Sequence, residues 1–216
     1  MLEIINSKSS DLEKIARCHQ SAFPDSLSSK MGINYLKKMI EWYITDKNRF
    51  LFHIEDNDKC IGYCGGMIHD ETQATGSASG MIQYSFNEAV KSILFRPWLL
   101  FHKELVSKFS LIRRNIKMRF KKRKFPSNKN HQTERSKALE RKAGLVVIGV
   151  AETYQGNGYG SLLLKGFENR AKEMKINIME LTVRNDNGAA IKSYERNGWV
   201  KSKLNGNSLE MYKIIN

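Results

Sequence analysis

Three glycines at alternate positions separate an apolar run from a helical pattern in the last third of the chain. They are Gly156, Gly158 and Gly160, between Gln155 and Ser161. Glycine lets the main chain approach a phosphate closely, and the unpaired N–H groups and positive dipole end of a following helix attract an anion. The segment therefore predicts a backbone site for a pyrophosphate-bearing cofactor, with an ordinary tight turn as the alternative.

The spacing of these glycines excludes two common phosphate-binding motifs. A P-loop needs Lys followed by Ser or Thr after its last glycine, whereas Ser161 follows Gly160 directly. A dinucleotide fingerprint is spaced G-x-G-x-x-G, whereas residues 156–160 are spaced G-x-G-x-G. The loop therefore belongs to another class of phosphate site.

A second informative segment, a strand followed by a capped helix, comes after the glycine loop. Residues 177–184 predict a strand, and residues 187–197 predict a helix that is capped by Asn187 and ends at Gly198. On that helix, the apolar side chains and Tyr194 fall on one face.

Together the two segments resemble the GNAT superfamily of acyl-CoA N-acyltransferases. Residues 155–160 match its Q/R-x-x-G-x-G/A pyrophosphate loop, and residues 187–199 match its N-x-x-A-x-x-x-Y-E-x-x-G-F segment, with Trp199 in place of Phe. The resemblance covers residues 145–216 closely and the N-terminal part in outline. It implies acetyl-CoA as the cofactor and direct transfer of its acetyl group to a primary amine.

The resemblance also implies a role for each site residue. Backbone N–H groups of the glycine loop would hold the pyrophosphate, the preceding strand would bind the pantetheine arm, and Val150 N–H would face the thioester oxygen. Tyr194 would protonate the departing thiolate, since a phenol with a pKa of ~10 is a proton donor at neutral pH. Packing is the alternative role for Tyr194, and helix capping for Asn187. The implied cofactor-binding residues are Ile148, Val150, Gln155, Gly156, Asn157, Gly158, Tyr159, Gly160, Ser161, Asn187 and Tyr194.

The general base is not marked by the motif. Relatives often carry a carboxylate on the strand before the loop, but residues 145–150 contain none. Glu152 lies just beyond that strand, Glu180 lies on the next one, and His69 ends an earlier hairpin. We expect Glu152 or His69 to serve, the latter because histidine titrates near neutral pH. Water-relayed deprotonation without a dedicated base is the alternative.

Periodicity places these segments in an α/β fold. The resemblance implies a GNAT-like mixed, mostly antiparallel sheet with flanking helices, and the length of the chain fits one domain that spans residues 1–216. The predicted strands are 2–5, 50–54, 60–68, 145–150, 177–184, 199–204 and 208–214, and the predicted helices are 9–20, 35–43, 159–174 and 187–197.

A basic, mostly helical insertion interrupts this pattern at residues 73–142. It begins as a small-residue loop at 73–80, continues as a helix over 86–120 and includes a loop at 121–130. Residues 103–142 carry fifteen Lys and Arg against three Glu, a net +12 of the chain's +14. Three interpretations stay open: a helical flap over the acceptor site, a membrane-surface helix that mixes Trp98 and Phe101 with cations, and a nucleic-acid or ribosome contact.

Composition argues against several other classes of protein. Three cysteines, Cys18, Cys60 and Cys64, are an odd number with poor zinc spacing, so we expect neither a disulfide framework nor a metal. The start of the chain has no signal-peptide pattern, and no run of 18 uncharged apolar residues occurs. We expect a cytoplasmic protein, peripheral at the inner membrane surface if the insertion binds lipid.

The acceptor is less constrained than the cofactor. The sequence at 22–36, together with the basic insertion, resembles GNAT members of bacterial surface-polysaccharide clusters, which implies an amino sugar. Another small amine and a protein or ribosome-associated amine are alternatives. The missing strand carboxylate supports a different class, a CoA-binding regulatory module without transferase activity.

Overall fold

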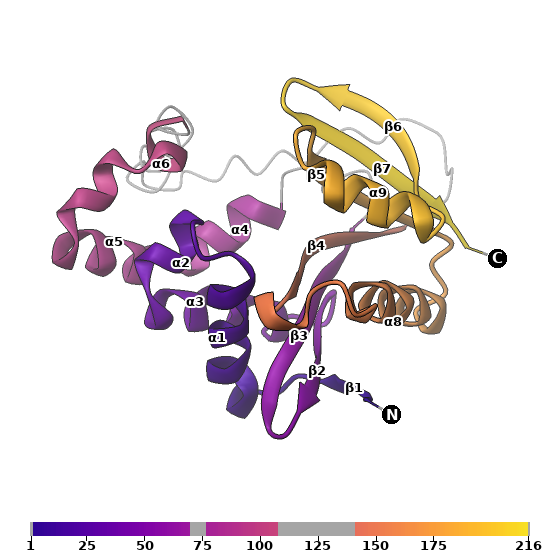
Figure 1. Cartoon of the computed structure of the whole chain (residues 1–216), viewed down its shortest axis with the longest axis horizontal. Helices are drawn as coiled ribbons and strands as arrows, with labels where there is room; N and C mark the ends of the chain where they lie inside the picture. Colours follow the sequence, from indigo (N-terminus) through magenta and orange to yellow (C-terminus); the bar gives the residue numbers. More distant parts are fainter. Residues whose placement is uncertain (1, 70–76, 108–140, 216) are drawn as a thin grey trace, which may run out of the picture.

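A single seven-stranded sheet forms the centre of the molecule (Figure 1). The computed structural model describes residues 2–69, 77–107 and 141–215. The strand order is β1-β2-β3-β4-β5-β7-β6, and every neighbouring pair is antiparallel except β4 and β5, which run parallel. The mixed, mostly antiparallel sheet predicted from the sequence is therefore confirmed. The strands are β1 Ile4–Asn6, β2 Arg49–Asp56, β3 Lys59–His69, β4 Lys142–Val150, β5 Ile178–Arg184, β6 Val200–Asn205 and β7 Ser208–Ile214.

Helices cover both faces of this sheet. On one face lie α1 (Leu12–Ala22), α2 (Leu27–Met31) and α3 (Ile33–Glu41), and on the other lie α8 (Tyr159–Glu173) and α9 (Gly188–Arg196) (Figure 1). Neighbouring residues of β2 supply both cores, because Leu51 packs with the first layer and Phe52 with the second. A sheet that is buried on both faces needs apolar residues at consecutive positions, which explains the near-continuous apolar runs of its central strands.

Several boundaries differ from the sequence prediction. The small-residue loop predicted at 73–80 is wrong for its last four residues, because Ser77–Tyr84 form α4. The predicted helix over 86–120 is interrupted within its described part, giving α5 (Phe86–Phe95), a 3-10 turn at Pro97–Phe101, called η4, and α6 (Lys103–Ser107). Proline lacks an N–H and disfavours helical geometry in the residue before it, and Arg96 accordingly has φ −136°. Residues 108–140, with the predicted loop at 121–130, lie outside the described residues.

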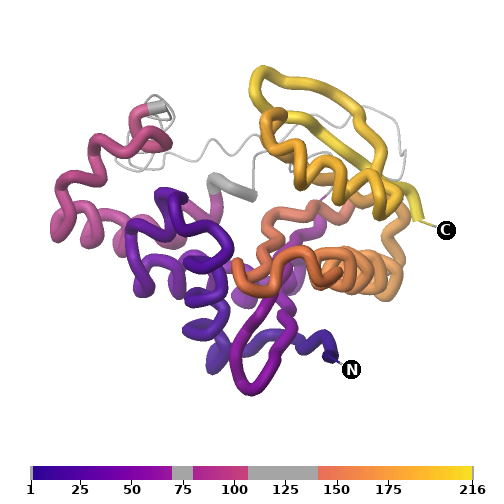
Figure 2. Tube along the Cα trace, in the orientation of Figure 1, coloured from indigo at the N-terminus to yellow at the C-terminus, as the bar shows by residue number. Residues whose placement is uncertain are grey.

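The helices of the insertion pack on the first helical layer. Helices α5 and α6 lie at the end of the molecule remote from α8 and the C-terminal strands (Figure 2). Helix α5 contacts α2 and α3, η4 contacts α2, and Leu27 N–H of α2 donates to Glu104 of α6. The elements that carry the glycine loop and the insertion are thus separated by the layer of α1–α3.

Candidate active site

The sheet opens between β4 and β5. Their parallel ladder runs from Lys142 opposite Ile178 to Leu145 opposite Leu181 and then ends, although β4 continues to Val150. On its other edge, β4 stays paired with β3 as far as Val150 opposite Gly62. The edge of β4 that faces β5 is therefore open from residue 146 onward.

A β-bulge at Val146 marks the point of separation. Gly65 lies opposite Val147 and Gly66 opposite Leu145, so Val146 is the extra residue. Val146 and Val147 both pack against the α1–α3 layer, which consecutive residues of a regular strand do not do. No local pattern in the sequence predicts this bulge, because the run of valines and Ile148 shows no alternation that an inserted residue would interrupt.

The main chain beyond the bulge presents N–H groups to the opening. Ala151 N–H donates to the Ile61 carbonyl of β3 at 2.9 Å. Because successive residues of a strand direct their N–H groups to opposite edges, those of Val150 and Ile148 point away from β3. The carbonyl of Val150 accepts a bond from Gln155 Nε2 at 3.0 Å, which ties the end of β4 to the glycine loop.

The glycine loop ends in the exposed first turn of α8. Gly156 and Gly158 adopt left-handed φ angles of 81° and 84°, which favour glycine at both positions. The first α8 hydrogen bond runs from Leu162 N–H to the Gly158 carbonyl at 3.1 Å. The N–H groups of residues 159–161 consequently have no acceptor within the helix, and Gly158 offers no capping side chain.

The space around the three loop glycines is open. A Cβ atom placed on Gly156, Gly158 or Gly160 would meet no protein atom within 4 Å. Gly160 is helical, so neither its φ angle nor crowding by the protein requires glycine there. The open backbone, its free N–H groups and the helix dipole together have the features of an anion site.

Side-chain contacts hold the loop in this shape. Tyr154 donates to Asp56 Oδ2 at 3.3 Å, and Asn157 Nδ2 donates to the Tyr154 carbonyl at 3.4 Å. Asn197, at the end of α9, donates to Ser161 Oγ at 3.1 Å. Sequence reasoning missed Asn197 because its partner is 36 residues away and depends on how α8 and α9 pack.

Tyr194 lies beside the open strand. It is half-buried on α9, with its ring 6.1 Å from that of Trp199, and it packs into the same apolar cluster as Ile148 and Val150. Burial raises the pKa of Tyr194 to about 12, so its phenol stays protonated at neutral pH. The predicted strand residues and the predicted acid therefore pack against the same apolar core.

Asn187 caps α9, as the sequence pattern indicates. Its Oδ1 accepts the N–H of Ala190 at 3.2 Å. The side-chain amide nitrogen takes no part in that cap, so capping and a hydrogen bond to a cofactor are compatible roles.

The two predicted base candidates lie in different places. His69 Nε2 is 3.0 Å from Glu180 Oε1, so these residues of β3 and β5 form a pair across β4. Gly144 lies between them, directly opposite Glu180, and a Cβ there would lie 3.4 Å from His69 Nε2. The bond from His69 holds the pKa of Glu180 below its usual range.

The His69–Glu180 pair lies on the sheet face opposite α8. The residues next to the pair, Ile68, Met179 and Leu181, are all in the core on the α8 side, and side chains alternate between faces. Glu152 is instead exposed beyond the far end of β4, in the 3-10 turn Glu152–Tyr154, where its N–H donates to Ser21 Oγ at 3.0 Å. The structure therefore joins His69 to Glu180 and leaves Glu152 apart from them.

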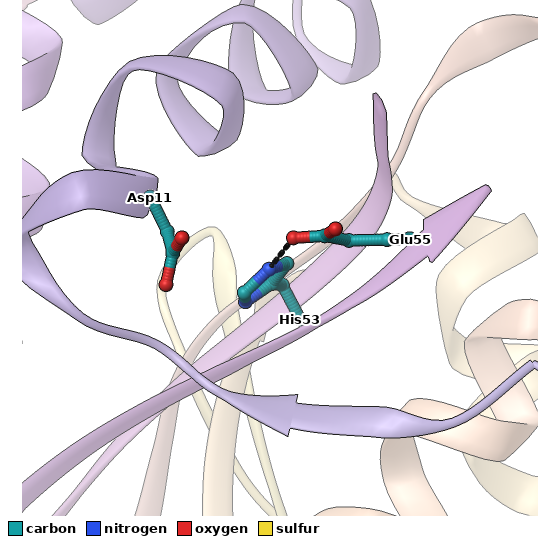
Figure 3. Close-up of side chains that lie close together, drawn as sticks. All are labelled: Asp11, His53 and Glu55. Atoms are coloured by element: carbon teal, nitrogen blue, oxygen red, sulfur yellow. Dashed lines mark hydrogen bonds and ion pairs between the residues drawn. The ribbon is translucent and has the colours of Figure 1, made fainter. Parts of the chain in front are cut away.

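A separate polar cluster joins the first helix to β2 (Figure 3). Asp11, His53 and Glu55 could each offer one ligand atom, all within 4.8 Å of one another. His53, however, already bonds Ser7 Oγ at 2.8 Å and Glu55, while Lys14 pairs with Glu55 and, at 3.1 Å, with Asp11. An ammonium group that neutralises both carboxylates makes this cluster a structural ion network rather than a metal site.

A family model matches one third of the chain. Residues 128–199 match the model of the Acetyltransferase (GNAT) family, a stretch that includes the glycine loop and all of α9. This third of the chain is similar to the GNAT family. No curated protein sequence matches the chain significantly.

Solved structures agree on the GNAT fold. The PaiA N-acetyltransferase of Thermoplasma acidophilum in complex with coenzyme A is 14% identical, with a TM-score of 0.57 over 100% of this chain and 99% of that one. The ribosomal-protein-S18-alanine N-acetyltransferase of Escherichia coli is 15% identical, with a TM-score of 0.54 over 100% and 95%. Arabidopsis thaliana NAA60 in complex with acetyl-CoA is 14% identical, with a TM-score of 0.58 over 100% and 99%.

Proposed function

We propose that this GNAT-like protein is an acetyl-CoA-dependent N-acetyltransferase that moves an acetyl group directly from the thioester to a primary amine. The observation that carries the proposal is one continuous stretch, residues 148–161, which joins an open strand edge to the uncapped start of α8. Such a stretch offers hydrogen bonds to an extended arm and then an anion site for a diphosphate. Two structural neighbours are described as complexes with coenzyme A or acetyl-CoA, which supports the same cofactor.

Binding uses the backbone more than side chains. The N–H groups of residues 156–161 hold the diphosphate, and those of Ile148 and Val150 bind the pantetheine arm. Val150 N–H faces the thioester oxygen and stabilises negative charge that develops there. Asn187 adds a hydrogen bond from its amide nitrogen, and Gln155 keeps the end of β4 aligned with the loop.

Acetyl-CoA supplies an acyl group that is already activated as a thioester, so the protein must manage two protons. His69 lies opposite Lys142, at the other end of the β3–β4 ladder from Val150. It therefore accepts the proton of the incoming ammonium by relay through water, and Glu180 orients the imidazole through their 3.0 Å bond. The amine enters from the face that carries this pair, and α8 binds the cofactor on the other face. Tyr194 donates a hydrogen bond to the departing sulfur from a phenol that burial keeps protonated.

The acceptor that we propose is an amino sugar or another small primary amine. The Escherichia coli neighbour is described as acting on the alanine of a ribosomal protein, so a protein N-terminus is the second acceptor to test. A CoA-binding regulator is the rival function, because residues 145–150 of β4 carry no carboxylate.

An assay of coenzyme A release tests the proposal. Purified protein is incubated with acetyl-CoA and a panel of amino sugars, other small amines and N-terminal peptides, and coenzyme A affinity is measured by calorimetry. We expect turnover with at least one acceptor. We also expect Tyr194→Phe to lower kcat by roughly 10²-fold with unchanged coenzyme A affinity. The exposed Tyr212 offers a control, since Tyr212→Phe should leave kcat unchanged.

The outcomes separate the rival functions. Coenzyme A binding without transfer to any acceptor would favour the regulator. Failure to bind coenzyme A would contradict both. Transfer by the Tyr194→Phe variant at the wild-type rate would remove the role of that hydroxyl and leave the activity intact.

A further inference from the structure

The side chain of Phe23 lies directly against the last part of β4. Phe23 ends α1, where its N–H donates to the His19 carbonyl at 2.9 Å. A Cβ atom added to Gly149 would lie 2.9 Å from Cε2 of Phe23 and 2.9 Å from Cε1 of Tyr63, closer than Cβ atoms approach their neighbours in proteins. Glycine at position 149 therefore allows both aromatic rings to contact the main chain of β4.

This contact adjoins the position that the proposed function gives to the thioester. Val147 and Ala151 both pack with the α1–α3 layer, and because side chains alternate along a strand, position 149 faces that layer too. The next residue is Val150, whose N–H points from the open edge of β4 toward the thioester oxygen. The ring of Phe23 thus lies on the face of the sheet from which the amine enters, against the residue next to the one that binds the reacting carbonyl.

Neighbouring contacts hold this ring in place. Its centroid lies 5.0 Å from that of the His19 imidazole, which bonds the buried hydroxyl of Tyr63. Ser21 Oγ accepts the N–H of Glu152 at 3.0 Å, which ties the end of α1 to the residues that follow β4. Phe23 is nevertheless only half-buried, so part of its ring is open to a ligand. A fixed apolar wall of this kind discriminates between ligands by their size.

We propose that the ring of Phe23 limits the length of the acyl chain that the protein accepts. Beyond its carbonyl carbon, an acetyl group has a single methyl group, whereas propionyl and butyryl groups have longer chains. The additional carbons of these chains meet the ring. This limit rests on the proposed function, because that function places the thioester beside Val150.

Two other roles for Phe23 predict different behaviour. A ring that only packs α1 on β4 would affect stability when it is removed, but not the preference among acyl chains. A ring that contacts the acceptor would affect the KM of the amine equally with every acyl donor. Only a ring beside the acyl group changes the discrimination between donors.

Calorimetry with a series of thioesters measures this discrimination without any acceptor. Purified protein is titrated with coenzyme A, acetyl-CoA, propionyl-CoA and butyryl-CoA. We expect the wild type to bind butyryl-CoA at least about tenfold more weakly than acetyl-CoA, since a single methylene in an apolar site can change discrimination by that factor. Phe23→Ala should bring the two affinities within about threefold of each other.

A smaller change keeps the test valid if Phe23→Ala does not fold. Phe23→Leu retains an apolar side chain at the end of α1 and should give an intermediate difference between acetyl-CoA and butyryl-CoA. Phe101→Ala removes a ring of η4 that is 85% exposed, and it should keep the wild-type preference. Coenzyme A carries no acyl group, so its affinity should be unchanged in all three variants, and circular dichroism verifies their fold.

Contrary results identify which statement fails. Equal wild-type affinity for acetyl-CoA and butyryl-CoA, or the same difference in the wild type and in both Phe23 variants, overturns the role of Phe23 and leaves the proposed function intact. A KM of the amine that rises equally with acetyl-CoA and propionyl-CoA, without a change in donor affinities, assigns the ring to the acceptor instead. Failure of the wild type to bind coenzyme A contradicts the proposed function and, with it, this limit on chain length.

Discussion

At Gly160, the effect of a substitution on stability can be distinguished from its effect on coenzyme A binding. This residue is helical and has no protein atom near the position of a Cβ, so the apo protein does not need glycine there. Alanine is the better helix former by up to about 1 kcal/mol. Gly160→Ala should therefore raise the free energy of unfolding slightly and keep coenzyme A binding, since the resembled loop accepts either residue at this position.

The larger substitution Gly160→Leu should behave differently. We expect its thermal stability to stay close to that of the wild type, and its affinity for coenzyme A to fall at least tenfold, because its side chain takes the space of the diphosphate. Thermal melts without ligand and calorimetry with coenzyme A measure the two effects separately. Wild-type affinity in this variant would show that the phosphates do not approach Gly160.

The pair of His69 and Glu180 makes a prediction about pH. Their 3.0 Å bond keeps the pKa of Glu180 below its usual range, and the same carboxylate favours the charged form of the imidazole. Glu180→Gln should therefore move the acid limb of the kcat/KM profile to lower pH, and His69→Gln should remove that limb and lower kcat roughly 10²-fold.

The exposed Glu152 provides the control for this pair. Glu152→Gln should leave the profile unchanged if His69 is the base, because Glu152 is exposed and is not part of the His69–Glu180 pair. An unchanged acid limb in His69→Gln, or its loss in Glu152→Gln, would transfer the role of base to Glu152.

Some of these residues could be predicted from the sequence and others could not. The glycine loop and Asn187 act through local backbone geometry, so short motifs record them. The partnership of His69 with Glu180 depends on the register of three strands, and 110 residues separate the two along the chain. The sequence indicated both residues as separate candidates, but it did not predict that their side chains would contact each other.

Among the secondary-structure elements, α1, β3 and α2 are connected by a buried group of hydrogen-bonded side chains around His19. His19 bonds the hydroxyl of the fully buried Tyr63 at 2.5 Å and Ser28 Oγ at 3.0 Å. Burial lowers the pKa of His19 to about 4, whereas an unfolded histidine has a pKa of ~6.5. Between these values the unfolded state binds more protons, so stability falls as pH decreases.

The buried His19 should make the stability of the protein sensitive to mild acid. We expect the free energy of unfolding to fall by about 3 kcal/mol from this group as pH decreases from neutral to below the folded pKa of about 4. His19→Gln should be less stable at neutral pH but should show a flatter pH dependence above pH ~4.5, where carboxylates titrate little. Urea unfolding across this range measures both, with His102→Gln as the control expected to keep the wild-type slope. An undiminished slope in His19→Gln would contradict this account.

Element boundaries followed the sequence wherever one local signal dominated. The amphipathic period of α1, α3 and α8 and the alternation of β7 predicted their limits within a few residues. Pro97 was a visible helix breaker, yet the apolar period on both sides of it favoured one continuous helix over 86–120. The bulge at Val146 had no local signal, because the pairing of β4 with β3 determines it.

For the whole molecule, the sequence predicted the layered architecture because both cores draw on the same apolar strands. Periodicity predicted the individual strands and helices, and the family resemblance predicted that they form a mixed sheet with flanking helices. The direction in which the insertion presents its apolar side chains could not be predicted, since it depends on contacts of Arg96 and Glu104 with α2. Charge asymmetry leaves all three interpretations of the insertion open, because residues 108–140 lie outside the described residues.

The short ladder between β4 and β5 has a consequence for how long the protein survives. Four residue pairs are the whole main-chain connection between strands β1–β4 and strands β5–β7 in the described sheet. A cofactor that bonds β4 and also contacts α9 would brace both halves, and a ligand that binds only the native state suppresses local opening. We therefore expect proteases to degrade the protein faster in cells that are short of coenzyme A. The coenzyme A level would then affect the amount of the protein as well as its rate of acetyl transfer.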